Sequence, residues 1–205
     1  TLDTSSPAPA LPPPRPSPAR GEGEGRWPRR LAVGGLVLGL VLYFAAAFVG
    51  GVVHDIEATL PPVPKPEAVP TSAVVVDRDG RLLRPYTIAD GRWRLPVALA
   101  DVDPAFIAML EAYEDRRFKE HHGIDWRAIG RAALQMVRSG QIVSGGSTLT
   151  MQVARLIDGT PTRGPLGKLR QMLFARVIED RLSKDEILSL YLALAPYGGN
   201  LEGIR

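Results

Sequence analysis

The pattern of apolar and polar residues divides the chain into distinct parts. Residues 1–30 are rich in proline and poor in large apolar side chains, residues 31–53 contain no charged residue, and residues 72–205 mix apolar and polar positions. Residues 1–30 have too few large apolar side chains to offset the entropy lost on ordering, so we expect a disordered tail. Because about 20 apolar residues cross a bilayer as a helix, residues 31–53 predict a transmembrane helix. A single soluble domain is therefore excluded.

The charges that flank the apolar run predict its orientation. Arg26, Arg29 and Arg30 precede the run, whereas Asp55 and Glu57 follow it. The positive-inside rule then places the N-terminus in the cytoplasm and the rest of the chain outside. The run exceeds the apolar stretch of roughly 7 to 15 residues in a cleaved signal peptide, which favours an uncleaved signal anchor.

A proline-rich linker is expected between the anchor and the exported domain. Five prolines lie between Leu60 and Pro70, and such spacing favours a stiff, extended chain. Residues 54–71 therefore predict a spacer that holds the next segment off the membrane.

The exported domain, residues 72–205, begins with short strands. Ser72–Val76 is β-branched and apolar, an Asp-Gly turn follows, and Leu82 and Leu83 complete a predicted hairpin. Trp93, Leu95 and Val97 alternate with polar neighbours and predict a third strand or an extended arm.

Helical periodicity dominates the rest of the domain. Apolar residues recur at helical spacing, glycines separate the segments, and Ser183 followed by Glu186 is a capping-box signature. The predicted helices are residues 104–117, 126–137, 148–157, 166–182 and 184–194. The sequence thus predicts a mainly α domain with a small β element, preceded by one transmembrane helix.

Composition narrows the chemistry. The chain has 205 residues, a net charge of +3 and no cysteine. A charge this small gives no argument for nucleic acid as a partner. The absence of cysteine excludes disulfides, thiolate zinc sites and a cysteine nucleophile.

A first candidate site is the polar cluster that starts at Glu114. If its helix continues, Glu114, Phe118 and His121 lie at i, i+4 and i+7 and share one face. A carboxylate beside apolar surface is suited to general acid or base chemistry. Charge runs are usually solvated helix faces, and spacing alone favours that interpretation here, so a functional interpretation needs a second feature.

The second feature is the glycine-rich stretch that precedes the predicted helix 148–157. Backbone N–H groups at adjacent glycines can approach a ligand, and the positive end of the following helix suits a phosphate. Gln152 and Arg155 lie on one side of that helix. An ordinary helix start is the alternative, and no Walker loop is present. The stretch comprises Gly145, Gly146, Ser147 and Thr148.

Three ordered motifs resemble the glycosyltransferase family 51 domain of bifunctional class A penicillin-binding proteins. Glu-Asp-Arg-Arg-Phe-x-x-His-x-Gly starts at Glu114, Gly-Gly-Ser-Thr-Leu-Thr-x-Gln at Gly145, and Leu-Ser-Lys-Asp-Glu-Ile-Leu-x-x-Tyr-Leu at Leu182. The resemblance covers residues 71–205 and is strongest to the 1C type. It implies a lysozyme-like, mainly helical transglycosylase fold.

The resemblance also implies an activity and residue roles. Proteins of this family polymerise lipid II into β-1,4 glycan strands outside the membrane and release undecaprenyl pyrophosphate. Glu114 is then the general base, and Asp115, Phe118 and His121 support or position it. Pyrophosphate is expected to bind to Gly145, Gly146, Ser147, Thr148, Gln152, Arg155, Lys168 and Gln171.

The chain departs from the family at one motif. The family pattern is Arg-Lys-x-x-Glu, whereas Gly167, Lys168 and Gln171 stand here. A neutral amide thus replaces a carboxylate assigned to pyrophosphate or metal handling, which argues against dependence on Mg²⁺ or Mn²⁺, and no metal ligand is predicted. Arg170 is expected to substitute for the lost arginine.

The resemblance places the domain outside the bacterial inner membrane. The expected partners are lipid II, the growing glycan strand, the membrane and other cell-wall synthesis proteins. No Ser-x-x-Lys occurs, so the transpeptidase nucleophile is absent and is expected beyond Arg205, in a longer protein of which this chain is a fragment. Two alternatives stay open: a lysozyme-like muramidase, and a membrane-anchored scaffold with impaired catalysis.

Overall fold

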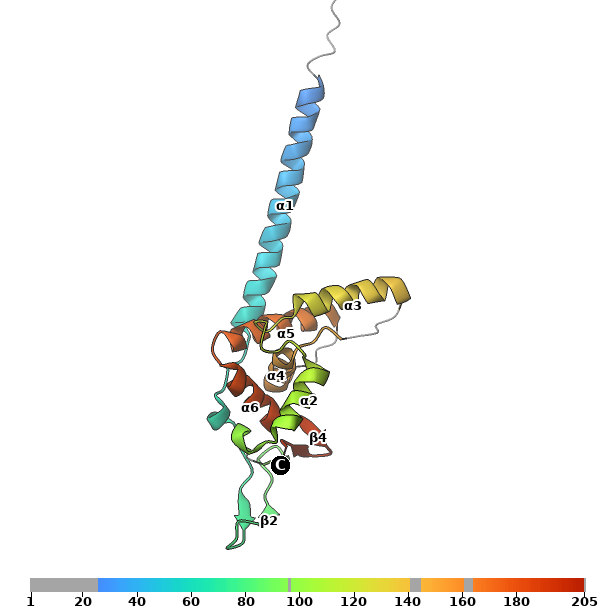
Figure 1. The fold of residues 1–205 in the computed structure, drawn as a ribbon. Helices are drawn as coiled ribbons and strands as arrows, with labels where there is room; N and C mark the ends of the chain where they lie inside the picture. The colour runs from blue at the N-terminus through green and yellow to red at the C-terminus, as the bar shows by residue number, and fades with distance from the viewer. Residues whose placement is uncertain (1–25, 96, 141–144, 161–163, 205) are drawn as a thin grey trace, which may run out of the picture. The chain divides into compact units, whose positions relative to one another are not determined.

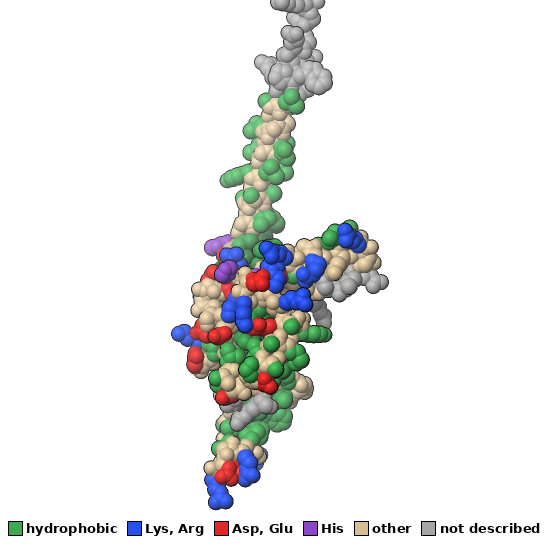
Figure 2. Space-filling model, in the orientation of Figure 1, with side chains coloured by type: hydrophobic (Ala, Val, Ile, Leu, Met, Phe, Trp, Pro, Cys, Tyr) green, Lys and Arg blue, Asp and Glu red, His purple; other side chains and the backbone are tan. Residues whose placement is uncertain are grey.

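The computed structural model describes residues 26–95, 97–140, 145–160 and 164–204 (Figure 1). It begins with α1, Arg26–Ala58, which starts earlier and ends later than the apolar run alone predicts. Residues Leu31–Ala58 are long and apolar enough to cross a membrane. The most apolar stretch of this helix is not buried against the rest of the protein. Figure 2 shows apolar side chains along this helix. The predicted disordered tail lies outside the described residues up to residue 25.

The predicted hairpin is confirmed, but the third strand pairs elsewhere. β1, Val74–Val76, pairs antiparallel with β2, Leu82–Pro85. β3, Trp93–Arg94, instead pairs in parallel with β5, Leu201–Glu202, which also pairs antiparallel with β4, Pro196–Gly198.

A buried ion pair explains the pairing of β3. The Arg94 guanidinium donates to Glu202 Oε2 through two nitrogens, at 2.9 and 2.5 Å, and to the Pro70 carbonyl at 3.0 Å. A buried carboxylate requires such a partner. These residues are 108 positions apart, so local alternation cannot reveal the contact.

The five helices of the domain form close to the predicted ranges. α6 has the predicted bounds and the predicted capping box at Ser183 and Glu186. α5 starts and ends a few residues earlier than predicted, because its chain turns before Ser183 starts the next helix. The helices are α2 (Pro104–Glu114), α3 (Trp126–Ser139), α4 (Leu149–Asp158), α5 (Gly164–Glu179) and α6 (Lys184–Leu194).

The prediction for α2 is wrong at its C-terminus. The helix ends at Glu114, because Asp115 adopts φ −158° and ψ 77°, and its side chain bonds elsewhere. Glu114, Phe118 and His121 therefore do not share a helical face.

The core forms where α4, α5 and α6 pack against one another. α3 carries no buried residue and extends away from this core (Figure 1). The fully buried large side chains include Phe118, Leu149, Met151, Phe174, Ile178, Ile187, Leu190 and Leu192. The predicted mainly α fold with a small β element and one apolar N-terminal helix is confirmed.

The proline-rich segment is extended, yet it is not a free spacer. Leu60 and Val63 pack against the core, and Val69 is buried in it. The short helix η1, Pro66–Ala68, contacts α6. Arg170 donates to the Thr59 carbonyl at 2.8 Å. The segment is thus attached along the domain, because its few apolar side chains are buried there.

Gly123 offers a test of the packing between the segment after α2 and α5. Gly123 and Gly91 both have a φ of +80°, but only at Gly123 would a Cβ meet backbone, 2.9 Å from the Ala175 carbonyl group. Gly91→Ala should lower the free energy of unfolding by about 1–2 kcal/mol from left-handed strain. Gly123→Ala should lower it clearly further, as chemical denaturation in detergent would measure. Equal losses would contradict this packing argument.

Candidate active site

Glu114 and Gln152, predicted from different motifs, are in direct contact. Glu114 is the last residue of α2 and is half-buried, and Gln152 lies in the second turn of α4. Gln152 Nε2 donates to Glu114 Oε2 at 2.7 Å. The bond holds the carboxylate in one orientation against α4.

Asp115 connects the end of α2 to the start of α4. Its Oδ2 accepts from the backbone N–H of Leu149 at 3.0 Å, and both carboxylate oxygens lie 3.0 Å from His121 Nε2. Asp115 and His121 are both buried. Because Asp115 follows Glu114 directly, these bonds fix the position of Glu114 relative to α4.

Phe118 and His121 support the site from the core and do not line it. Phe118 is 1% exposed, and Lys184 Nζ lies 4.5 Å from its ring centroid. Lys184 also donates to the His121 carbonyl at 2.7 Å. The structure therefore separates the predicted cluster into Glu114 and Asp115, which line a cavity, and Phe118 and His121, which lie behind them.

Thr148 caps α4. Thr148 Oγ1 accepts from the Met151 N–H at 3.1 Å and donates to the Gly123 carbonyl at 2.6 Å. A Cβ at Gly146 would lie 3.0 Å from Ile129 Cγ1, so glycine allows this stretch to approach α3 closely. Ser147 is exposed and is left to face the pocket.

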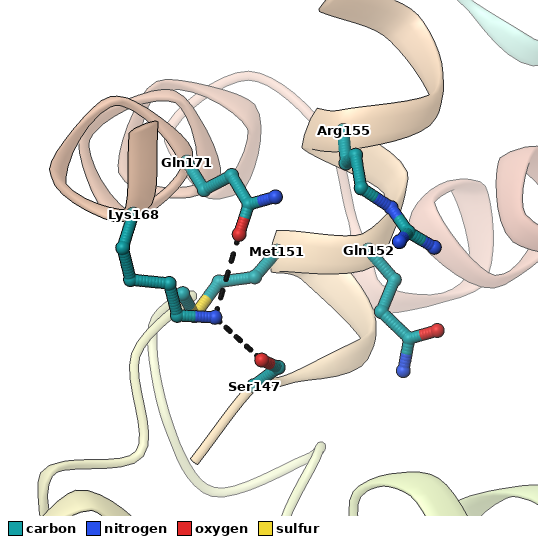
Figure 3. A pocket seen from close by; sticks show the side chains of 6 residues that line it. All are labelled: Ser147, Met151, Gln152, Arg155, Lys168 and Gln171. Atoms are coloured by element: carbon teal, nitrogen blue, oxygen red, sulfur yellow. Dashed lines mark hydrogen bonds between the residues drawn. The ribbon is translucent and has the colours of Figure 1, made fainter. Parts of the chain in front are cut away.

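A cationic pocket of about 290 Å³ lies between α4 and α5. Lys168 and Gln171 project from α5, and the other lining side chains come from α4 and the residue before Thr148 (Figure 3). Lys168 Nζ donates to Ser147 Oγ and to Gln171 Oε1, the latter at 3.4 Å. No acidic residue is among the described residues that line it: Ser147, Met151, Gln152, Arg155, Lys168 and Gln171.

The positive charges of Arg155 and Lys168 in this pocket are not balanced by an acidic residue among the described residues that line it. Burial lowers the pKa of Lys168, and the positive charge of Arg155 lowers it further. The charged form of a lysine whose pKa is lowered by burial, and further by a second cation at the same cavity, is stabilised when an anion binds there. The pocket is therefore suited to a phosphate or pyrophosphate group.

A second cavity, of about 490 Å³, lies on the other side of the glycine-rich stretch. Ser147 lines both cavities, and Glu114 lines the second. Three arginines also line it, whereas its other two carboxylates are engaged: Asp115 as described, and Asp125 with Arg117 at 3.0 Å and the Ala128 N–H at 2.9 Å. The arginines are Arg116, Arg117 and Arg131.

The expectation that Arg170 joins the pyrophosphate site is wrong. Its guanidinium donates to both Asp158 oxygens at 2.8 Å and to Thr59. The side-chain bond from Arg170 is the main cause that lowers the pKa of Asp158. Arg170 thus joins the end of α1 to α4 and α5, because a nearby carboxylate and carbonyl satisfy its donors.

Tyr191 belongs to the electrostatic surroundings of Glu114, although its motif looks structural. Burial raises the pKa of Tyr191 to about 12, and the negative charge of Glu114 is the next largest cause. The phenol therefore stays protonated near the carboxylate. In the sequence, a tyrosine within the apolar α6 is indistinguishable from a core residue.

The residues around Lys168 do not fit a divalent cation. Among the described residues, no three His, Cys, Asp or Glu side chains gather at one place. At the position where the motif predicts a carboxylate, the buried Gln171 amide faces the Lys168 ammonium. A neutral amide that faces a lysine ammonium is a poor set of ligands for a hard divalent cation.

The fold and site define a helical domain in which one oriented carboxylate lies beside a cationic pocket, which is typical of an enzyme that acts on a phosphate-bearing substrate. The family model described as Transglycosylase matches residues 79–205. The chain therefore belongs to the transglycosylase family, and the prediction of a class A penicillin-binding protein glycosyltransferase domain is confirmed.

Similar proteins support the assignment to the 1C type. Penicillin-binding protein 1C of Escherichia coli is 51% identical over 144 residues, 70% of this chain and 18% of that protein. Penicillin-binding protein 1A of Pseudomonas aeruginosa is 35% identical over 175 residues, 83% of this chain and 20% of that protein. The chain spans about a fifth of the length of these relatives. With the apolar α1, they indicate a membrane-anchored protein.

The lowered pKa of Lys168 in the cationic pocket predicts that the affinity for pyrophosphate depends on pH. Inorganic pyrophosphate should bind while Lys168 is protonated, and its affinity should fall as pH rises through the lowered pKa of Lys168, below the ordinary value of about 10.4. Lys168→Arg keeps its charge and should show a flatter profile. Calorimetric titration of both proteins from neutral to alkaline pH would test this, since titration of pyrophosphate itself affects both equally. Parallel profiles would contradict it.

Proposed function

We propose that this chain polymerises lipid II into β-1,4 glycan strands with release of undecaprenyl pyrophosphate, as the N-terminal part of a bifunctional penicillin-binding protein. The observation that carries the proposal is the Glu114 carboxylate, held by Gln152, beside the pocket of Arg155 and Lys168. Membership of the transglycosylase family supports the reaction class.

Glu114 is the general base of the proposed reaction. It takes the proton from the 4-hydroxyl of the incoming lipid II while that oxygen attacks the donor anomeric carbon. The bond from this carbon to the pyrophosphate oxygen breaks, with inversion. Gln152 orients Oε2, and a positioned base of this kind contributes roughly 10²–10⁴-fold to rate.

Arg155 and Lys168 hold the leaving group. Negative charge builds up on the pyrophosphate as it departs, and cations placed beforehand stabilise that charge most in the transition state. Ser147 Oγ, within hydrogen-bonding distance of Lys168, and the N-terminus of α4 contribute further donors and positive potential. Gly145 and Gly146 let backbone N–H groups approach the substrate, and Gln171 orients Lys168.

Asp115, Phe118, His121 and Thr148 are positioning residues in this proposal. Each is buried and contacts the chain around α4 or the segment after α2. Their role is to keep Glu114 and the glycine-rich stretch at the correct separation, since small misplacements of catalytic groups are costly.

The proposed topology follows from the flanking charges. Residues 1–30 are the cytoplasmic tail, residues 31–53 the anchor, residues 54–71 the linker and residues 72–205 the catalytic domain, outside the bacterial inner membrane. Arg26, Arg29 and Arg30 before the span, and Asp55 and Glu57 after it, support this orientation. Partners are lipid II, the growing strand, the membrane and other cell-wall synthesis proteins.

Supplying the full-length protein with lipid II in detergent tests the function. Glycan polymer and undecaprenyl pyrophosphate should both accumulate. Hydrolysis of preformed glycan without polymer formation would support the muramidase instead. That alternative needs a second carboxylate at the scissile bond, but Asp115 and Asp125 are both engaged. No lipid II turnover at all would favour the scaffold, which the Gly167 and Gln171 departures suggest.

The base assignment predicts the effect of a single substitution. Glu114→Gln should lower polymerisation by roughly 10²–10⁴-fold, because the amide cannot accept the proton. Binding of a lipid pyrophosphate donor should persist, because the cationic pocket is unchanged. Glu120→Gln is the matched control, since Glu120 is exposed and bonds only to Arg117 among the described residues. Polymerisation by Glu114→Gln at the parent rate would refute the assignment.

A further inference from the structure

A small apolar groove lies where the end of α1 meets the first turns of α5. It has a volume of about 340 Å³. Val52 and Ile56 line it from α1, and Leu166 lines it from α5. Leu166 is 65% exposed, so its side chain is accessible to an apolar ligand in the groove.

The walls of this groove are joined firmly. Arg170 bonds to Thr59 through both its Nη1 and Nη2, at 2.7 and 2.8 Å, and to Asp158. Thr59 follows α1, and Arg170 lies in α5. This contact sets the spacing between the two walls, so the groove is a formed feature of residues 50–205, which are one compact unit.

The apolar groove and the cationic pocket lie on either side of one helical turn. Gly167 lines the groove, and Lys168, the next residue, lines the pocket. Consecutive Cα atoms are about 3.8 Å apart. A molecule with an anionic group attached directly to an apolar chain could therefore occupy both cavities across the first turns of α5.

The groove also coincides with the end of the predicted membrane span. Val52 belongs to the charge-free run that ends at residue 53, and Ile56 follows one turn later. An apolar chain that leaves a bilayer beside this helix reaches the groove first. Asp55 also lines the groove and disfavours an anion there, and the charge of Arg170, which lines it too, is paired with Asp158. The anionic group is therefore directed to the cationic pocket.

We propose that this groove binds the isoprene units next to the pyrophosphate of the lipid-linked donor, while Arg155 and Lys168 hold the pyrophosphate. The inference rests on the proposed function and adds a site for the prenyl chain. The volume lies at the lower end of small-molecule pockets. The groove therefore takes the first units of the chain, and the bilayer holds the rest.

Lipid II carrying the undecaprenyl chain, compared with lipid II carrying a short geranyl chain, tests the groove in the full-length protein. Leu166→Ser should raise KM for both substrates by on the order of tenfold through lost apolar contact, because both chains contain the isoprene units next to the pyrophosphate that the groove binds. Leu83→Ser is the control, because Leu83 is 64% exposed in β2, away from this groove.

The outcomes separate this inference from the proposed function. A rise of KM for the undecaprenyl substrate alone, or for neither substrate, overturns the groove while polymerisation by the parent protein upholds the function. No polymer from the parent protein with either substrate refutes the function itself.

Photo-crosslinking gives a second measurement, first with a photoreactive lipid on the unsubstituted protein. A diazirine on the isoprene unit nearest the pyrophosphate should label the peptides that contain Leu166 or Val52–Thr59. Labelling confined to α3 would overturn the inference. A crosslink from a photoreactive residue at position 166 to another protein, unaffected by the lipid, would show a protein occupant instead and overturn it too.

Discussion

The site depends on one buried carboxylate, Asp115. It accepts from the first N–H of α4 and pairs with His121, and these bonds satisfy a charge whose burial would otherwise be costly. The same bonds draw the chain out of the helical conformation after Glu114. The end of α2 and the start of α4 are thereby joined, and only in that arrangement does Gln152 reach Glu114.

Basic residues have two separate roles in this domain. Arg94, Arg170 and Lys184 bond to acidic residues and carbonyls, and so connect segments that are distant in the sequence. Arg155 and Lys168 make no ion pair with an acidic residue among the described residues, and they face the same pocket. A small net charge thus conceals a local excess of positive charge, which is what an anionic leaving group requires.

The first turns of α5 lie between the cationic pocket and the apolar groove. On one side they contribute Lys168 to the cationic pocket, and on the other they contribute Leu166 to the apolar groove beside the end of α1. Arg170 connects this helix to Thr59. A substrate that is apolar at one end and anionic in the middle would match this order of surfaces.

Local patterns in the sequence predict the apolar α1, the hairpin of β1 and β2 and the capping box of α6, and the motifs identify the residues around Glu114 and Lys168. The end of α2 at Glu114, the pairing of β3 with β5 and the structural role of Arg170 follow from tertiary contacts. The packing of the linker on the core is likewise a tertiary feature. Each of these depends on contacts between residues far apart, 34 positions for Asp115 with Leu149 and 111 for Arg170 with Thr59. Periodicity and capping report only neighbours within a few residues, so they carry no information about such partners.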